Sequence, residues 1–67
     1  MNTKRILFDE LKKFHPDKDF VGGVISNVKT VEEQQKVINY IRHGDDVTIE
    51  NIILLSLHLK NERTTQS

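Results

Sequence analysis

Apolar residues recur at intervals of three and four along most of this chain, which is the spacing of one face of an α-helix. The first such segment begins at Asn2 or Thr3, either of which can cap a helix, and it ends near Phe14. Pro16 disfavours helical geometry at the residue before it, so we expect the helix to stop at His15. The pattern predicts one amphipathic helix, whose apolar arc contains Leu7, Phe8, Leu11 and Phe14.

The second apolar segment, Phe20 to Val28, contains two adjacent glycines and allows two interpretations. Its apolar residues have helical spacing, and Asp17 or Asp19 could cap its start. Gly22 and Gly23 together cost roughly 2 kcal/mol relative to alanines inside a helix. The segment therefore predicts a short helix, with an extended segment bent at the glycines as the alternative, because Val, Ile and Phe also favour strands.

The third segment begins with a capping box and ends at a glycine. Thr30 precedes Glu33 by three residues, so the hydroxyl and the carboxylate can each accept a backbone N–H at the helix start. Arg42 and His43 lie where cations favour a helix C-terminus, and Gly44 offers a left-handed stop. The face of this predicted helix contains Val31, Gln34, Val37, Ile38 and Ile41.

The fourth segment opens at Asp46 or Thr48 and is apolar over a wide arc. Six of its apolar residues span roughly 200° of a helical wheel, and Leu54 lies outside that arc, between Glu50 and His58. Such a helix is either central to the bundle or closes against a second chain, because monomers seldom expose a broad apolar patch. We expect a homodimer whose interface includes Ile52, Leu54, Leu55 and Leu59.

These segments predict an all-α fold, a small bundle of three or four short helices. Residues 1–60 form one helical domain in this interpretation, and residues 61–67 form a polar, frayed C-terminal tail. A chain of 67 residues buries only about 60% of the surface that it exposes when unfolded, so its core is thin. No cysteine is present to form a disulfide, which favours oligomerisation as the additional source of stability and fits a reducing, cytoplasmic setting.

The charges of the chain balance, with ten Lys plus Arg against ten Asp plus Glu. A net charge of zero removes the broad attraction that drives binding to nucleic acids or anionic membranes. The longest mainly apolar run, Ile52 to Leu59, is far shorter than the roughly 20 residues that cross a bilayer, so no membrane partner is expected. A small nucleic-acid-binding regulator is the alternative function, with phosphate contacts from the basic residues of the first helix, Lys4, Arg5, Lys12 and Lys13.

The segment LFDELKKFHPDKD resembles part of a J-domain, in which a basic amphipathic helix precedes a His-Pro-Asp loop. The resemblance implies that His15, Pro16 and Asp17 contact an Hsp70 partner. A J-domain has a further helix before the basic one, whereas fourteen residues precede His15 here, and FVGGVISNV stands where that family has a polar loop. We therefore interpret Pro16 as a helix stop and Asp17 as a cap of the next helix, with a J-domain-like co-chaperone fragment as a third alternative.

The sequence contains no arrangement typical of catalysis or of metal binding. His15, His43 and His58 have no short ligand spacing, and no cysteine could complete a zinc site. Ser56 lies in the middle of an apolar face, where a hydroxyl commonly bonds to the carbonyl of the preceding turn. We expect no enzymatic activity, no cofactor and no metal. The expected function is that of a protein-interaction or accessory module, whose partners are a second copy of the chain and an unidentified protein.

Overall fold

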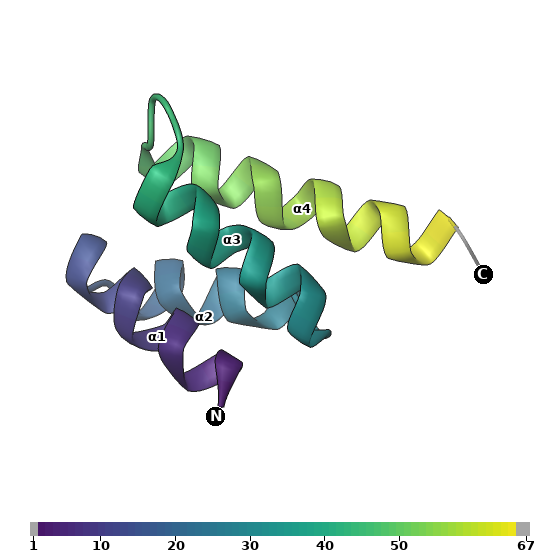
Figure 1. The fold of residues 1–67 in the computed structure, drawn as a ribbon, viewed down its shortest axis with the longest axis horizontal. Coiled ribbons are helices and arrows are strands. Elements are labelled where there is room, and N and C mark those ends of the chain that lie inside the picture. Colours follow the sequence, from purple (N-terminus) through teal and green to yellow (C-terminus); the bar gives the residue numbers. More distant parts are fainter. Residues whose placement is uncertain (1, 66–67) are drawn as a thin grey trace.

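Short connections join four α-helices in residues 2–65, the part of the chain that the computed structural model describes. These are α1 (Thr3–Phe14), α2 (Lys18–Asn27), α3 (Val31–His43) and α4 (Ile49–Thr65). The predicted all-α bundle is confirmed (Figure 1). No helix within this part of the chain is long and apolar enough to cross a membrane.

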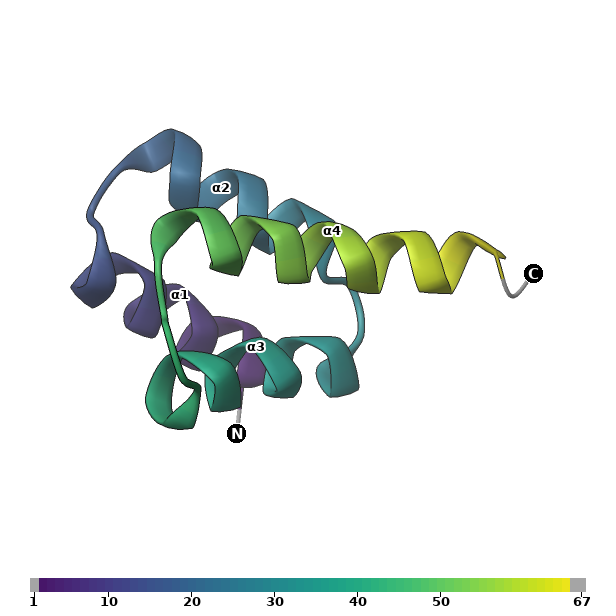
Figure 2. The same ribbon diagram turned by 90° about the horizontal axis from the view of Figure 1, so that it is seen from above.

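The two middle helices hold the bundle together. Both α2 and α3 pack against α1 on one side and against α4 on the other (Figures 1 and 2). All four helices and the turn after α2 contribute to one small core, which contains Leu7, Leu11, Phe20, Val21, Val24, Val28, Val37, Ile38, Ile52 and Leu59. Because α1 and α4 lie on opposite sides of the molecule in Figure 1, each has an outer face that no other helix of residues 2–65 covers.

The first two helices begin at caps that the sequence predicts. The Asn2 side chain accepts a hydrogen bond of 3.2 Å from the N–H of Arg5, and α1 stops at His15. The Asp17 carboxylate accepts hydrogen bonds from the N–H groups of Asp19, at 2.8 Å, and Phe20, at 3.1 Å. The second segment is therefore helical, and the extended alternative is wrong.

Gly22 and Gly23 lie inside α2 on its exposed side. Neither has a positive φ, and apart from its chain neighbours and the backbone of α2 itself, a Cβ atom added to either would meet no atom within 4 Å in the described structure. Each glycine costs about 1 kcal/mol of helix stability relative to alanine. The packing of this chain on itself therefore gives no reason for glycine at these two positions.

The capping box of α3 is confirmed. The N–H of Glu33 donates to the Thr30 hydroxyl at 3.1 Å, and the N–H of Thr30 donates to the Glu33 carboxylate at 3.2 Å. The same carboxylate oxygen accepts the N–H of Lys29 at 2.9 Å. One side chain thus satisfies two backbone donors at the sharp turn between α2 and α3.

The connection from α3 to α4 differs from the prediction, because Gly44 is not its left-handed residue. Gly44 has a φ of −72°, and the positive φ of 55° belongs to Asp46, a residue type that tolerates this conformation. The hydroxyl of Tyr40, at 2.8 Å, and the amide of Asn51, at 2.9 Å, both donate to the Asp46 carbonyl. Gly44 is required for a different reason: a Cβ there would lie 2.5 Å from Cδ1 of Tyr40.

The last helix is capped at Thr48, one of the two predicted starts, whose hydroxyl accepts the N–H of Asn51 at 3.0 Å. It continues to Thr65, past residue 60, where the sequence predicts the domain to end and a frayed tail to begin. Arg63 explains the additional turn, because its guanidinium pairs with Glu33 at the start of α3. Residues 66 and 67 of the predicted tail lie outside the described residues.

Candidate functional site

The outer side of α4 exposes four large apolar side chains. Their exposed fractions are 37% for Ile49, 37% for Ile53, 54% for Leu54 and 39% for Leu57. Their spacing places them on one side of the helix. We call these four residues the α4 apolar face.

The interface residues predicted from the sequence divide between two sides of α4. Leu54 belongs to the α4 apolar face, whereas Ile52 and Leu59 are buried in the core of the chain itself and Leu55 is half-buried against that core. Ile52 and Leu59 therefore cannot face a partner while the chain keeps this fold. Helical periodicity shows the breadth of the apolar surface, but it does not show which part the other helices cover.

Ser56 lies on the side of α4 that turns inward. Its side chain is fully buried, and its hydroxyl donates to the Ile53 carbonyl at 2.8 Å, as the sequence predicts. It also accepts a hydrogen bond of 3.1 Å from the Asn27 amide at the end of α2. These two bonds satisfy the buried hydroxyl on the side of α4 that faces α2. This orientation leaves Ile53 and Leu57 facing outward.

Charged residues stand at both ends of the α4 apolar face. Glu50 lies near the start of the helix and Lys60 lies nearly three turns later, and both side chains are exposed. No ion pair within residues 2–65 involves either of them. The face therefore has an acidic end and a basic end.

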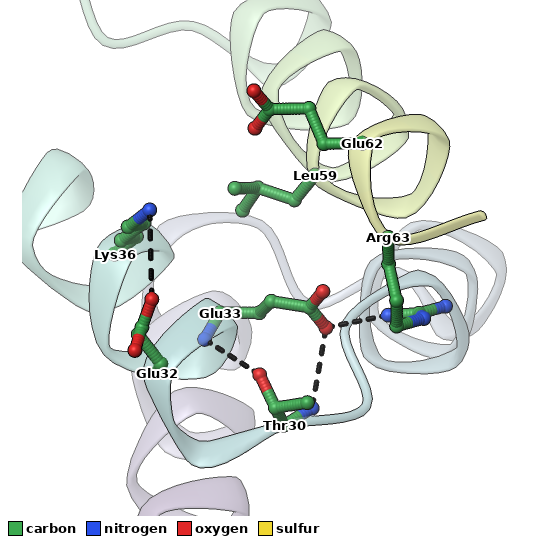
Figure 3. Close-up of a pocket in the computed structure, with 7 residues that line it drawn as sticks. All are labelled: Thr30, Glu32, Glu33, Lys36, Leu59, Glu62 and Arg63. Carbon is green, nitrogen blue, oxygen red and sulfur yellow. Dashed lines mark hydrogen bonds and ion pairs between the residues drawn. The ribbon is translucent and has the colours of Figure 1, made fainter. Parts of the chain in front are cut away.

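A polar hollow of about 420 Å³ lies between the start of α3 and the end of α4 (Figure 3). Arg63 projects from α4 into this region, pairs with the Glu33 carboxylate and donates to the Asn27 carbonyl at 3.3 Å. Lys36 and Glu32 form an ion pair of 3.9 Å on its wall. These contacts join α2, α3 and α4, so we interpret the hollow as the place where the end of α4 is fastened.

Glu33 is the central group of this network, and its side chain is only 12% exposed. Burial alone would raise the pKa of the Glu33 carboxyl. Hydrogen bonds from the Thr30 and Lys29 backbone and the positive charge of Arg63 outweigh burial, so the pKa of Glu33 lies below its ordinary value. The sequence predicts the capping role of Glu33. It gives no local signal for Arg63, which lies thirty residues away.

The predicted nucleic-acid contacts are spread along the exposed surface of α1. Arg5 and Lys12 are seven residues apart and lie on the same side of the helix, but Arg5 forms an ion pair of 3.7 Å with Asp9. The Nζ atom of Lys12 lies 5.6 Å from the ring centroid of Phe8. Lys4 lines a depression together with Arg5 and Phe8, whereas Lys13 lies elsewhere around the helix. The fold therefore does not gather the four basic residues into one patch.

The three histidines are not brought together as a site. His15 ends α1 and makes an edge-to-face contact with Phe20, with ring centroids 5.5 Å apart. His43 is in the last turn of α3. On α4, Nε2 of His58 lies 3.5 Å from Oε1 of Glu62. Within residues 2–65, no group of three or more His, Cys, Asp or Glu side chains is placed to hold a metal ion.

The surface with the most evident capacity for binding is therefore the α4 apolar face, together with its charged ends. No protein-family model matches the chain, and searches of curated proteins and of solved structures found nothing similar to it.

Proposed function

We propose that this protein is a non-catalytic interaction or accessory module of the cytoplasm that acts as a homodimer through the α4 apolar face. The observation that carries the proposal is the row of exposed apolar side chains, Ile49, Ile53, Leu54 and Leu57, on the side of α4 that no other helix of residues 2–65 covers. Exposed apolar side chains gathered on one helix face are typical of contacts between proteins. The absence of cysteine from the chain fits a reducing compartment.

A second copy of the same helix suits this face in an antiparallel arrangement. A two-fold axis that crosses the α4 apolar face at the level of residue 55 places Ile53 opposite the partner's Leu57, because residue 55 is the midpoint between positions 53 and 57. The same axis places Glu50 opposite the partner's Lys60, since these positions share that midpoint. A parallel arrangement would instead bring like charges together, so the charge pattern favours the antiparallel dimer.

Leu54→Glu tests the dimer directly. Leu54 is one residue from the proposed axis, so the substitution brings two carboxylates close together in a contact from which water is excluded. Leu54 is also more than half exposed in the single chain, so we expect the variant to fold. In sedimentation equilibrium at micromolar concentration, the wild type should have the mass of two chains. The variant should dissociate at least about tenfold more readily, which corresponds to about 1.4 kcal/mol.

Val31→Glu is the matched control, because Val31 is 64% exposed and lies outside the α4 apolar face. This variant should keep the dimeric mass. Glu50→Lys and Lys60→Glu test the orientation: each should weaken the dimer alone, and the two together should restore it. A wild-type mass of one chain would refute the dimer, and a double variant no better than the single ones would refute the antiparallel arrangement.

A further inference from the structure

A second surface, on the side of the molecule formed by α1 and α2, has properties that dimerisation through α4 does not use. An open groove of about 300 Å³ lies between the two helices and their connection, and Phe8, Pro16 and Val21 form its apolar walls. Phe8 is 39% exposed, although Leu7 and Leu11 of the same helix are fully buried. We call this depression the α1–α2 groove. Its volume is enough for a large apolar side chain of another molecule.

Gly22 lies in the wall of the α1–α2 groove. It weakens its own helix, it does not have a positive φ, and apart from its chain neighbours and the backbone of its own helix no atom of the described structure lies within 4 Å of the position of a missing Cβ. A glycine on an exposed helix surface lets the backbone of another chain come close. The surface continues past Gly22 into adjoining depressions beside Ile25 and Lys4. Docking along this surface would therefore give Gly22 the role that internal packing does not give it.

The rim of the groove is mainly basic, although the chain as a whole is neutral. Lys12 and Lys18 line the groove itself, and Lys4 and Lys29 line its continuation. Among the described residues, the one carboxylate that lines the groove is that of Asp17, which is engaged at the start of α2 as the cap of that helix. An apolar floor with a basic rim is complementary to an apolar stripe flanked by acidic residues.

We propose that the α1–α2 groove binds an acidic amphipathic helix of a partner protein. Apolar side chains of that helix pack against Phe8, Pro16 and Val21, its backbone passes close to Gly22, and its carboxylates face Lys12 and Lys18. A protein segment fits better than a nucleic acid, because apolar side chains dominate the walls of the groove and provide few donors for phosphate.

A pair of synthetic helical peptides tests the proposal by fluorescence anisotropy with the full chain. Both carry the same stripe of leucine and tryptophan, one with glutamate on its flanks and the other with lysine. The acidic peptide should bind the wild type at least about tenfold more tightly than the basic one. Its affinity should fall as salt is added, because the rim contacts are electrostatic. Equal affinities for the two peptides, or no binding of the acidic one, would overturn the proposal.

Two neighbouring glycines provide the matched variants. Gly22→Gln and Gly23→Gln place the same side chain on the same helix, both where a Cβ meets no other atom, but only Gly22 lines the groove. Gly22→Gln should weaken binding of the acidic peptide by about tenfold or more, and Gly23→Gln should change it by less than about twofold. Equal effects of the two variants would show that binding occurs elsewhere. A single-stranded oligonucleotide that displaces the peptide at lower concentration than unlabelled peptide would identify the groove as a nucleic-acid site and overturn the protein partner.

The dimer and the groove can fail independently. Leu54→Glu alters α4 and leaves the groove unchanged, so this variant should bind the acidic peptide as tightly as the wild type does. Loss of peptide binding in this variant, with its helical signal intact, would place the peptide on the α4 apolar face and overturn the groove as its site. If the Leu54→Glu variant is monomeric and still binds the acidic peptide, the groove is supported as the binding site whether or not the wild type dimerises.

Discussion

The carboxylate of Glu33 makes three contacts. Two are with nearby backbone N–H groups, and the third is with a side chain thirty residues away in the sequence. It accepts the N–H groups of Lys29 and Thr30, and it pairs with Arg63 from α4. The Thr30 hydroxyl completes the capping box by accepting the N–H of Glu33. The cap is therefore local in sequence, whereas the ion pair depends on the tertiary fold.

At this scale, Thr30→Ala removes the hydroxyl while leaving Glu33 in place. We expect a loss of about 1 kcal/mol in the free energy of unfolding, the usual value of an N-cap. For a domain of this size the melting temperature should fall by about 4–8 °C. Thr30→Ser keeps the hydroxyl and should melt close to the wild type in the same circular dichroism experiment. An alanine variant as stable as the serine variant would show that the cap contributes little.

The residues that sequence reasoning predicts best are those whose partners lie within four positions. Asn2, Asp17 and Thr30 satisfy the backbone of the next turn, and a spacing rule is enough to identify them. Asn27 and Arg63 act through partners about thirty residues away, so no local pattern could reveal them. The part of α4 that the other helices cover is set by tertiary packing, which is why the predicted interface mixed buried and exposed residues.

Among the helices, α4 shows most clearly how a tertiary contact sets the length of an element. Its apolar pattern ends at Leu59, yet the helix continues to Thr65. Arg63 supplies the reason, because it ties this last part to the Asn27 carbonyl and to Glu33. Helical pattern alone predicts the first, third and fourth helices and leaves the second open to an extended alternative, and it places the end of α4 too early.

Arg63→Ala should therefore release the end of α4. The pair is partly buried, with side-chain exposures of 30% for Arg63 and 12% for Glu33, so we expect a loss of about 1 kcal/mol in local stability. Hydrogen exchange of the backbone amides in residues 60–65 measures it. Arg5→Ala is the control, because its ion pair with Asp9 is solvent-exposed and such pairs contribute little. Unchanged exchange at the end of α4 would show that Arg63 does not fasten it.

For the whole molecule, a thin core makes polar contacts between helices more important. Beside the ten buried apolar residues of the core, two ion pairs connect distant elements of the described structure: Glu10 with Arg42 joins α1 to α3, and Glu33 with Arg63 joins α3 to α4. Both lie at the periphery of the bundle. Conditions that remove one of these charges should therefore weaken the contact between two helices.

Lowering the pH is such a condition, because it removes the charge of Glu33. Because the pKa of its carboxyl is lower in the folded chain than in the unfolded one, the ionised form favours folding. The stability that this ionisation provides is complete above the ordinary glutamate pKa, and it is lost as the pH falls through the lower pKa of the folded state. Urea denaturation between neutral pH and about pH 3 should show this loss for the wild type.

The Glu33→Gln variant should be less stable than the wild type at neutral pH, and its stability should depend less on pH, since glutamine has no charge to lose and cannot pair ionically with Arg63. Glu32→Gln removes a neighbouring carboxylate whose side chain is 84% exposed, so its stability should follow the wild-type pH dependence. Parallel curves for the wild type and Glu33→Gln would mean that acid acts through other carboxylates, and that the junction of α3 with α4 does not control the stability of the molecule.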